Sequence, residues 1–147
     1  NVVRFNNYKI DGFESFVGEK TDIWFTVCCN PKHMNNIHEY KEVYTHSWEW
    51  DKEKCKIYQS ISQKRECVKM DRELVRSQIP IASPSTGLIA IIYFLTKYKK
   101  VKITGFDWWS SDKHHYGDNE KRGSMHKPTE EYQVISALMN NGLLEFL

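Results

Sequence analysis

The strongest constraint on the fold is an apolar segment in the second half of the chain. The run Leu88–Leu95, with the sequence LIAIIYFL, is apolar on nearly every face of a helix, so a helix here has no side suited to water. Ser83 or Ser85 can cap the start of this helix. Three cations follow its end, where they suit the helix dipole: Lys97, Lys99 and Lys100. The sequence therefore predicts a buried helix that packs on a sheet.

The segments that follow predict further strands and helices. A parallel-type strand is expected over 101–106, and a helix over 127–142 with Pro128 at a first position and Gly142 as its stop. Residues 143–147 are expected to return to the sheet. The expected helix carries four apolar residues on one face: Tyr132, Ile135, Leu138 and Met139.

The first half of the chain predicts a similar alternation. Residues 2–5 and 22–28 are expected strands, separated by a loop that contains two glycines. The other expected elements are a helix over 32–43, an extended segment over 44–50, a strand over 55–61 and a helix over 70–78. This alternation predicts an α/β domain with a single, open, mostly parallel sheet flanked by helices. In such domains ligands bind at the carboxyl ends of the strands.

Length and composition fit one globular domain. The chain has 147 residues, of which 40% are hydrophobic and 14% aromatic, enough for a buried core. Its 21 basic and 19 acidic residues leave a net charge of +2, without the clustered cations that duplex nucleic acid requires. No stretch approaches the roughly 20 apolar residues of a membrane helix, and membrane association is left open. The opening at Asn1 indicates a segment that starts inside a longer gene product.

The cysteines do not form a recognisable framework. They are too few and too irregularly spaced for a disulfide scaffold, and none forms the C-x-x-C pair typical of zinc sites. We interpret them as small buried hydrophobic residues in a reducing compartment: Cys28, Cys29, Cys55 and Cys67.

Two polar segments are candidates for ligand binding. Ser85, Thr86 and Gly87 provide hydroxyl and backbone N–H groups at a helix start, where an anion can bind and where glycine lets a ligand approach the backbone. Ordinary helix capping explains the same residues. Trp108 and Trp109 follow a strand end, where they can stack on a sugar or simply pack against other side chains.

The segment 114–132 holds three of the six histidines of the chain. The side chains of adjacent His114 and His115 point in different directions on any regular element, so the pattern does not specifically indicate a zinc site. His126 lies just before the expected helix, whose N-terminus favours the neutral imidazole that a general base needs. Glu131 could interact with the same helix start or orient this histidine. A solvated polar loop is the alternative that the local sequence leaves open.

Four segments, in this order, resemble the sialyltransferases of glycosyltransferase family 29. NVVRFNNYKIDGFESFVGEKTD resembles the second half of the large sialylmotif, and PSTGLIAIIYFLTKYKKVKITGFDWW resembles the small sialylmotif. His115, Tyr116 and Asp118 match motif three, H-Y-x-[DE], while His126 and Glu131 match the very small motif, H-x-x-x-x-E. The resemblance implies a Rossmann-like sheet of the variant GT-A type in one catalytic domain over residues 1–147.

The resemblance also implies an activity. A CMP-activated sialic acid, or CMP-Kdo or a related ulosonic acid, would be transferred to a glycan hydroxyl with inversion, without a metal or other cofactor. His126 would be the general base, and His115 would hydrogen-bond the donor phosphate. The residues that would bind the nucleotide are Asn6, Ser85, Thr86, Gly87 and Tyr116. Those that would support the site are Arg4, Asp118 and Glu131, and those that would contact the sugar are Trp108 and Trp109.

Three departures from the family pattern accompany the resemblance. The first half of the large motif is missing because the chain begins after it, and Gly117 replaces a usual aromatic residue. FLTKYKKV lacks the cysteine that forms a disulfide in the animal enzymes. This favours a cytoplasmic location, or one peripheral to the inner membrane, in a bacterial or viral source over the Golgi. A non-catalytic nucleotide- or glycan-binding relative and a zinc-dependent hydrolase are the competing hypotheses.

Overall fold

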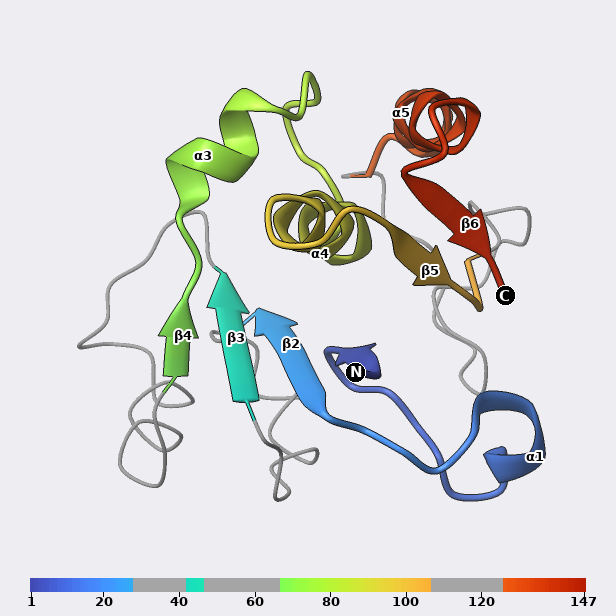
Figure 1. Cartoon of the computed structure of the whole chain (residues 1–147). Helices are drawn as coiled ribbons and strands as arrows, with labels where there is room; N and C mark the ends of the chain where they lie inside the picture. The colour runs from blue at the N-terminus through green and yellow to red at the C-terminus, as the bar shows by residue number, and fades with distance from the viewer. Residues whose placement is uncertain (28–41, 47–66, 107–125) are drawn as a thin grey trace. The chain divides into compact units, whose positions relative to one another are not determined.

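The computed structural model describes residues 1–27, 42–46, 67–106 and 126–147 (Figure 1). They divide into two compact units, Asn1–Arg72 and Glu73–Leu147. Each unit contains a parallel sheet and at least one helix, so the α/β class predicted from the sequence is confirmed.

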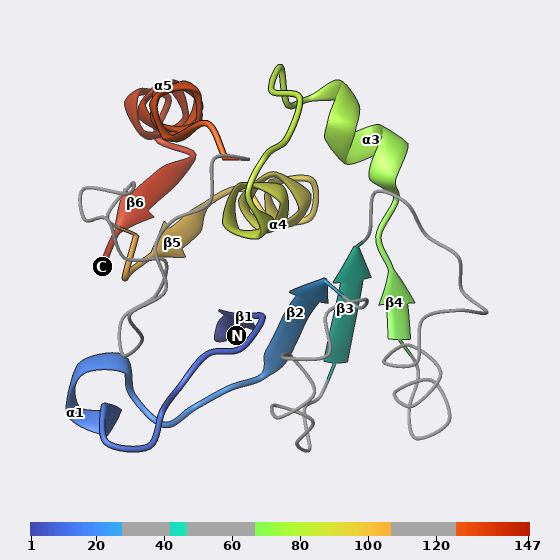
Figure 2. The same ribbon diagram turned by 180° about the vertical axis from the view of Figure 1, so that it is seen from behind.

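The first unit contains a sheet whose strands lie in chain order and run parallel. Its strands are β1 (Val3–Phe5), β2 (Ile23–Val27), β3 (Glu42–His46) and β4 (Cys67–Lys69). Figure 1 shows β2, β3 and β4 side by side with their arrowheads at the same edge, and Figure 2 shows them from behind. A short helix, α1 (Glu14–Val17), lies between β1 and β2.

The core of this sheet is aromatic. Ile23, Trp24 and Phe25 of β2 are all buried, as expected for a central strand of a parallel sheet with side chains covered on both faces. The Phe25 ring meets Phe5 of β1 edge-on at 6.3 Å and stacks on Tyr44 of β3 at 6.2 Å, measured between ring centroids. Because aromatic pairs favour these geometries, the contacts hold three neighbouring strands in register.

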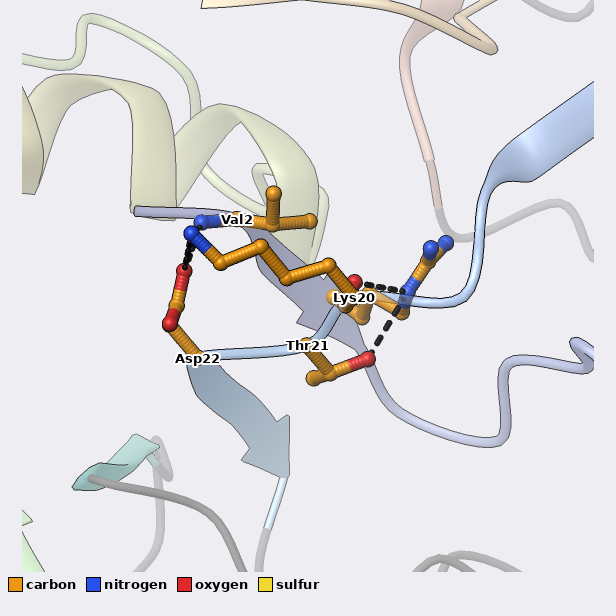
Figure 3. A network of polar contacts seen from close by, with 5 residues as sticks. Val2, Lys20, Thr21 and Asp22 are labelled. Atoms are coloured by element: carbon orange, nitrogen blue, oxygen red, sulfur yellow. Dashed lines mark hydrogen bonds and ion pairs between the residues drawn. The ribbon is translucent and has the colours of Figure 1, made fainter.

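A buried carboxylate anchors the start of β1 to the start of β2 (Figure 3). Asp22 is 3% exposed, and its Oδ2 accepts a hydrogen bond from the Val2 N–H at 2.8 Å. The Lys20 ammonium pairs with the same oxygen at 3.0 Å. A buried carboxylate requires such partners because its desolvation is costly, and here they join segments twenty residues apart in sequence.

The second unit contains α4 (Thr86–Leu95), β5 (Val101–Ile103), α5 (Pro128–Asn140) and β6 (Leu144–Phe146), while α3 (Arg72–Ser77) begins at the division between the units. Strands β5 and β6 pair in parallel, with Val101 opposite Leu144. Every residue from Leu88 to Phe94 is buried. The predicted buried helix is therefore confirmed, as are the strands predicted around residues 2–5, 22–28, 101–106 and 143–147.

Some predicted elements differ from the structure. The predicted helix over 32–43 is wrong at its end, because Glu42 and Val43 belong to β3, where β-branched and aromatic neighbours favour a strand. The loop expected between the first two strands contains α1. The three-residue strand β4 was not predicted, since so short a segment has no measurable periodicity. Residues 32–41 and the strand expected over 55–61 lie outside the described residues.

Two further expectations need correction. The described strands pair in two sheets where one was predicted, because the alternation of elements gives the class but not which strands pair. The predicted apolar face of α5 is also wrong in part: Tyr132 is 52% exposed and Met139 36%, whereas Glu131 and Ile135 are buried. Within the described ranges, no helix has the length and apolar character needed to cross a membrane.

The pair of lysines beside Glu145 generates a testable electrostatic prediction. Hydrogen bonds from the ammonium of Lys100, and then from that of Lys102, hold the pKa of the Glu145 carboxyl below its ordinary value of 4.5. Its contribution to stability is therefore present above 4.5 and is lost as the pH falls through the lowered value. In an NMR titration of the full-length protein, Lys100→Ala/Lys102→Ala should move the Glu145 midpoint upward. An unchanged midpoint would contradict the assignment.

Candidate active site

The start of α4 is built around Ser85. This residue is the N-cap of the helix, with extended φ and ψ angles of −67° and 157°, and its Oγ accepts a hydrogen bond from the Leu88 N–H at 3.2 Å. The bond satisfies one of the N–H groups that a helix start leaves without a carbonyl partner. Of the two serines that could cap this helix in the sequence, Ser85 is the one that does so.

Glu131 reaches this turn from the first part of α5. Its carboxylate accepts the Ser85 backbone N–H at Oε1 and the Ser85 hydroxyl at Oε2, each at 2.6 Å. Glu131 is only 2% exposed. Hydrogen bonds to an ionised carboxylate are about twice as strong as neutral ones, and a negative charge at the start of α4 is favourable with respect to the helix dipole. The starts of α4 and α5 are therefore joined by one side chain.

This contact changes the interpretation of both residues. Glu131 was predicted to interact with its own helix start or to orient His126, whereas its carboxylate bonds Ser85 at the start of the other helix. The predicted anion-binding turn already holds an anion from its own chain. The hydroxyl of Ser85 donates to Glu131 and accepts from Leu88, so its capping role is shown and its nucleotide role stays a prediction.

Gly87 is explained by packing. A Cβ atom built at this position would lie 2.6 Å from Cε1 and 3.2 Å from Cζ of Phe106. The Phe106 ring thus occupies the space that the glycine leaves open. Packing against Phe106 is therefore one reason for a glycine here, and the predicted contact of Gly87 with a ligand stays a prediction.

His126 precedes α5 by two residues. It is half-buried, and its Nδ1 atom is buried. The chain between His126 and Glu131 is fixed as the first turn of the helix, since the Glu131 N–H donates to the Lys127 carbonyl at 2.9 Å and Pro128 occupies the first helical position. The expected position of this histidine at a helix N-terminus is therefore confirmed.

Arg4 in the first unit holds a loop. Its Nη2 donates to the carbonyls of Val17 and Gly18 at 2.7 and 2.8 Å, and its Nε donates to the Thr21 hydroxyl at 2.9 Å and the Lys20 carbonyl at 3.3 Å. Figure 3 draws the two of these bonds that Lys20 and Thr21 accept. The guanidinium therefore closes the connection between α1 and β2. The supporting role predicted for Arg4 in the binding site stays a prediction.

Asn6 follows the carboxyl end of β1 with a left-handed backbone, φ 47°. Asparagine is among the few residues other than glycine that adopt this conformation readily. Its N–H donates to the Phe25 carbonyl at 3.0 Å, and its own carbonyl accepts the Trp24 indole N–H at 2.9 Å. The turn after β1 is therefore fixed on β2, at the edge of the sheet where a ligand was predicted.

Several predicted site residues lie outside the described residues: Trp108, Trp109, His115, Tyr116 and Asp118. The same holds for His114, which the hypothesis of a zinc-dependent hydrolase needs. In the parts of the chain that the structure describes, no three His, Cys, Asp or Glu residues group as metal ligands. Of the predicted residues that are described, the structure brings Ser85 and Glu131 into direct contact.

Comparison with known proteins identifies the class. The model of a family described as glycosyltransferase family 29 (sialyltransferase) matches residues 24–143. The chain therefore belongs to this family, which makes a sialyltransferase-type glycosyltransferase its general class. Such enzymes take a nucleotide-sugar donor and a glycan acceptor. No curated protein and no solved structure matches the chain.

Sequence reasoning missed the partners of two motif residues. Glu131 belongs to an apolar helix face, four residues before buried Ile135, and this spacing places both on one side of α5. A carboxylate at such a position requires buried donors, which was the available signal. For the contact between Gly87 and Phe106, the sequence offered no comparable signal.

The packing of Gly87 predicts that the effect of Gly87→Ala on the free energy of unfolding depends on whether Phe106 is present. Gly87→Ala should lower the free energy of unfolding, because overpacking costs about 1–3 kcal/mol and the gain in helix propensity is at most about 1 kcal/mol. With Phe106→Ala already present, the same substitution should be neutral or stabilising. Denaturant unfolding of the four variants measures this difference. Equal effects in both backgrounds would contradict the contact.

Proposed function

We propose that the protein transfers sialic acid from a CMP-activated donor to a glycan hydroxyl, with inversion and without a metal ion. A donor with a related ulosonic acid, such as CMP-Kdo, fits the same chemistry. The observation that carries the proposal is the family match over residues 24–143, which includes the small motif, motif three and the very small motif. A Rossmann-like fold of the variant GT-A type in one catalytic domain belongs to the same proposal.

The chemistry of the donor sets two requirements. CMP leaves as a phosphate monoester, so its developing negative charge needs hydrogen-bond donors, while the departing oxygen needs little protonation. The acceptor hydroxyl has a very high pKa and needs a positioned base that removes its proton as the new bond forms. We assign the first role to His115, supported by Tyr116 and Asp118, and the second to His126.

On the family motifs alone, Asn6 and the turn at the start of α4 are each proposed to contact the nucleotide. Asn6 occupies a turn fixed on β2, and backbone N–H groups at a helix start attract anions. Within the turn at Ser85, Thr86 and Gly87, both the hydroxyl and the N–H of Ser85 bond Glu131, so the proposal gives the nucleotide Thr86 and Gly87. Trp108 and Trp109 are proposed to contact the sugar.

Replacement of the proposed base is the first test. In the full-length protein, His126→Ala should reduce kcat for transfer from CMP-sialic acid to a glycan acceptor by about 10²–10⁴-fold, the usual contribution of general base catalysis. Affinity for CMP should change only a few fold, because the base faces the acceptor. CMP release in the presence of EDTA measures transfer, and isothermal titration measures binding.

Each competing hypothesis predicts a different outcome of these measurements. Full activity of His126→Ala would overturn the assignment of the base. CMP binding without turnover by the wild-type protein would favour the non-catalytic binding relative. Loss of wild-type activity in EDTA, together with stoichiometric zinc, would favour the metal-dependent hydrolase.

The phosphate role of His115 predicts a different kinetic pattern. His115→Ala should reduce kcat/KM for the donor, because it removes a hydrogen bond to the phosphate in the bound donor and in the transition state. The adjacent His114→Ala is the matched control and should behave as wild type, since His114 has no role in the proposal. Steady-state kinetics with varied donor measure both. Equal effects of the two substitutions would remove the specific role of His115.

A further inference from the structure

Glu131 is a charged residue in a position that an apolar residue could fill. It shares the buried face of α5 with Ile135, and both are at most 2% exposed. Replacing a buried charged group by a well-packed apolar side chain is often neutral or stabilising. Stability alone is therefore a weak explanation for a carboxylate here, and the geometry of its bonds offers a stronger one.

The bonds of Glu131 form a continuous path between two helix starts. The Leu88 N–H donates to Ser85 Oγ, and the Ser85 hydroxyl and N–H donate to the two carboxylate oxygens of Glu131. On the other side, the Glu131 N–H donates to the Lys127 carbonyl, which closes the first turn of α5. His126 is the next residue toward the N-terminus. The side chain of Glu131 is thus bonded to the turn at Ser85, and its backbone is bonded within the first turn of α5.

The two oxygens also fix orientation. A carboxylate that accepts two donors from one residue, here the N–H and the hydroxyl of Ser85 at 2.6 Å each, constrains rotation as well as distance. Charge-assisted hydrogen bonds of this kind add geometric specificity to their energy. A misplacement of about 1 Å at a reacting centre can cost about a hundredfold in rate. A rigid contact between the two turns is therefore of direct use to a transfer reaction.

We propose that Glu131 is a positioning residue: through Ser85 it fixes the start of α4 relative to the start of α5, and so sets the spacing between the nucleotide turn and His126. The catalytic part of this inference rests on the proposed function, whereas the coupling of the two helix starts does not. Glu131 itself takes no proton from the acceptor and contacts no substrate.

Glu131→Gln is the most informative variant. The glutamine oxygen can still accept the Ser85 N–H, but its NH₂ group faces the Ser85 hydroxyl, which then loses its acceptor. Side-chain volume is almost unchanged, so the substitution removes the charge and the acceptor of the Ser85 hydroxyl rather than packing. Glu130→Gln is the matched control, because Glu130 lies in the same turn of α5 and is exposed.

The first measurement is amide hydrogen exchange in the full-length protein. Loss of the charge-assisted bond should speed exchange at Ser85 and Leu88 by about tenfold to a hundredfold, with little change for amides in the middle of α4. Glu130→Gln should leave exchange at both positions unchanged. Unchanged exchange in Glu131→Gln would overturn the coupling, whatever the activity of the protein.

The second measurement separates positioning from folding. At a temperature where near-UV circular dichroism shows Glu131→Gln to be folded, kcat at saturating donor and acceptor should fall about tenfold or more, while the Kd for CMP changes less than kcat. A purely structural role would lower Tm and leave kcat of the folded protein unchanged, and this result would overturn the positioning role. Ser85→Thr keeps a hydroxyl and should retain more activity than Ser85→Ala.

Failure of the proposed function has a separate signature. A wild-type protein that binds no CMP and transfers no sugar would refute the transferase and the catalytic part of this inference together. The exchange result would still decide whether Glu131 couples the two helix starts. If Glu131→Ala fails to fold, Glu131→Gln and Ser85→Ala still test the same bonds from both ends.

Discussion

The complete burial of the middle of α4 is the constraint on which the second unit depends. A helix whose residues from Leu88 to Phe94 are all buried has no solvated face, so its polar backbone groups must be satisfied at its ends. At the start of the helix, Ser85 and the buried carboxylate of Glu131 meet this requirement. Burial of the apolar helix therefore requires the polar contact at its start, although Glu131 lies far from Ser85 in sequence.

The same principle applies to the first unit. Asp22 and Arg4 both use their charges within the protein. Asp22 holds the Val2 N–H and the Lys20 ammonium, and Arg4 binds the connection that leads into β2. Motif residues can therefore act by shaping the loops around a site, and the charge of a side chain does not by itself assign it to a substrate.

The sequence predicts the elements better than their partners. The buried helix, the strand after it and the helix that starts at Pro128 follow from apolar runs, capping residues and proline, which are local signals. Ser85 and Glu131 are 46 residues apart in the chain, and a local sequence pattern cannot indicate a contact over this separation. The α5 face was predicted from its apolar residues, but the buried group at its start is a glutamate. A carboxylate can be buried in a core only where hydrogen-bond donors reach it, and the tertiary fold decides where those donors lie.

The contact between Ser85 and Glu131 affects how inactive relatives of this family should be recognised. A protein that has lost transferase chemistry but kept the fold still needs a buried helix with a capped start, and this need preserves the serine that caps it. It places no such demand on a histidine at the position of His126. The presence of the S-T-G turn therefore diagnoses the architecture, whereas the motif glutamate and the histidines are the residues whose loss would mark a relative as a pseudoenzyme.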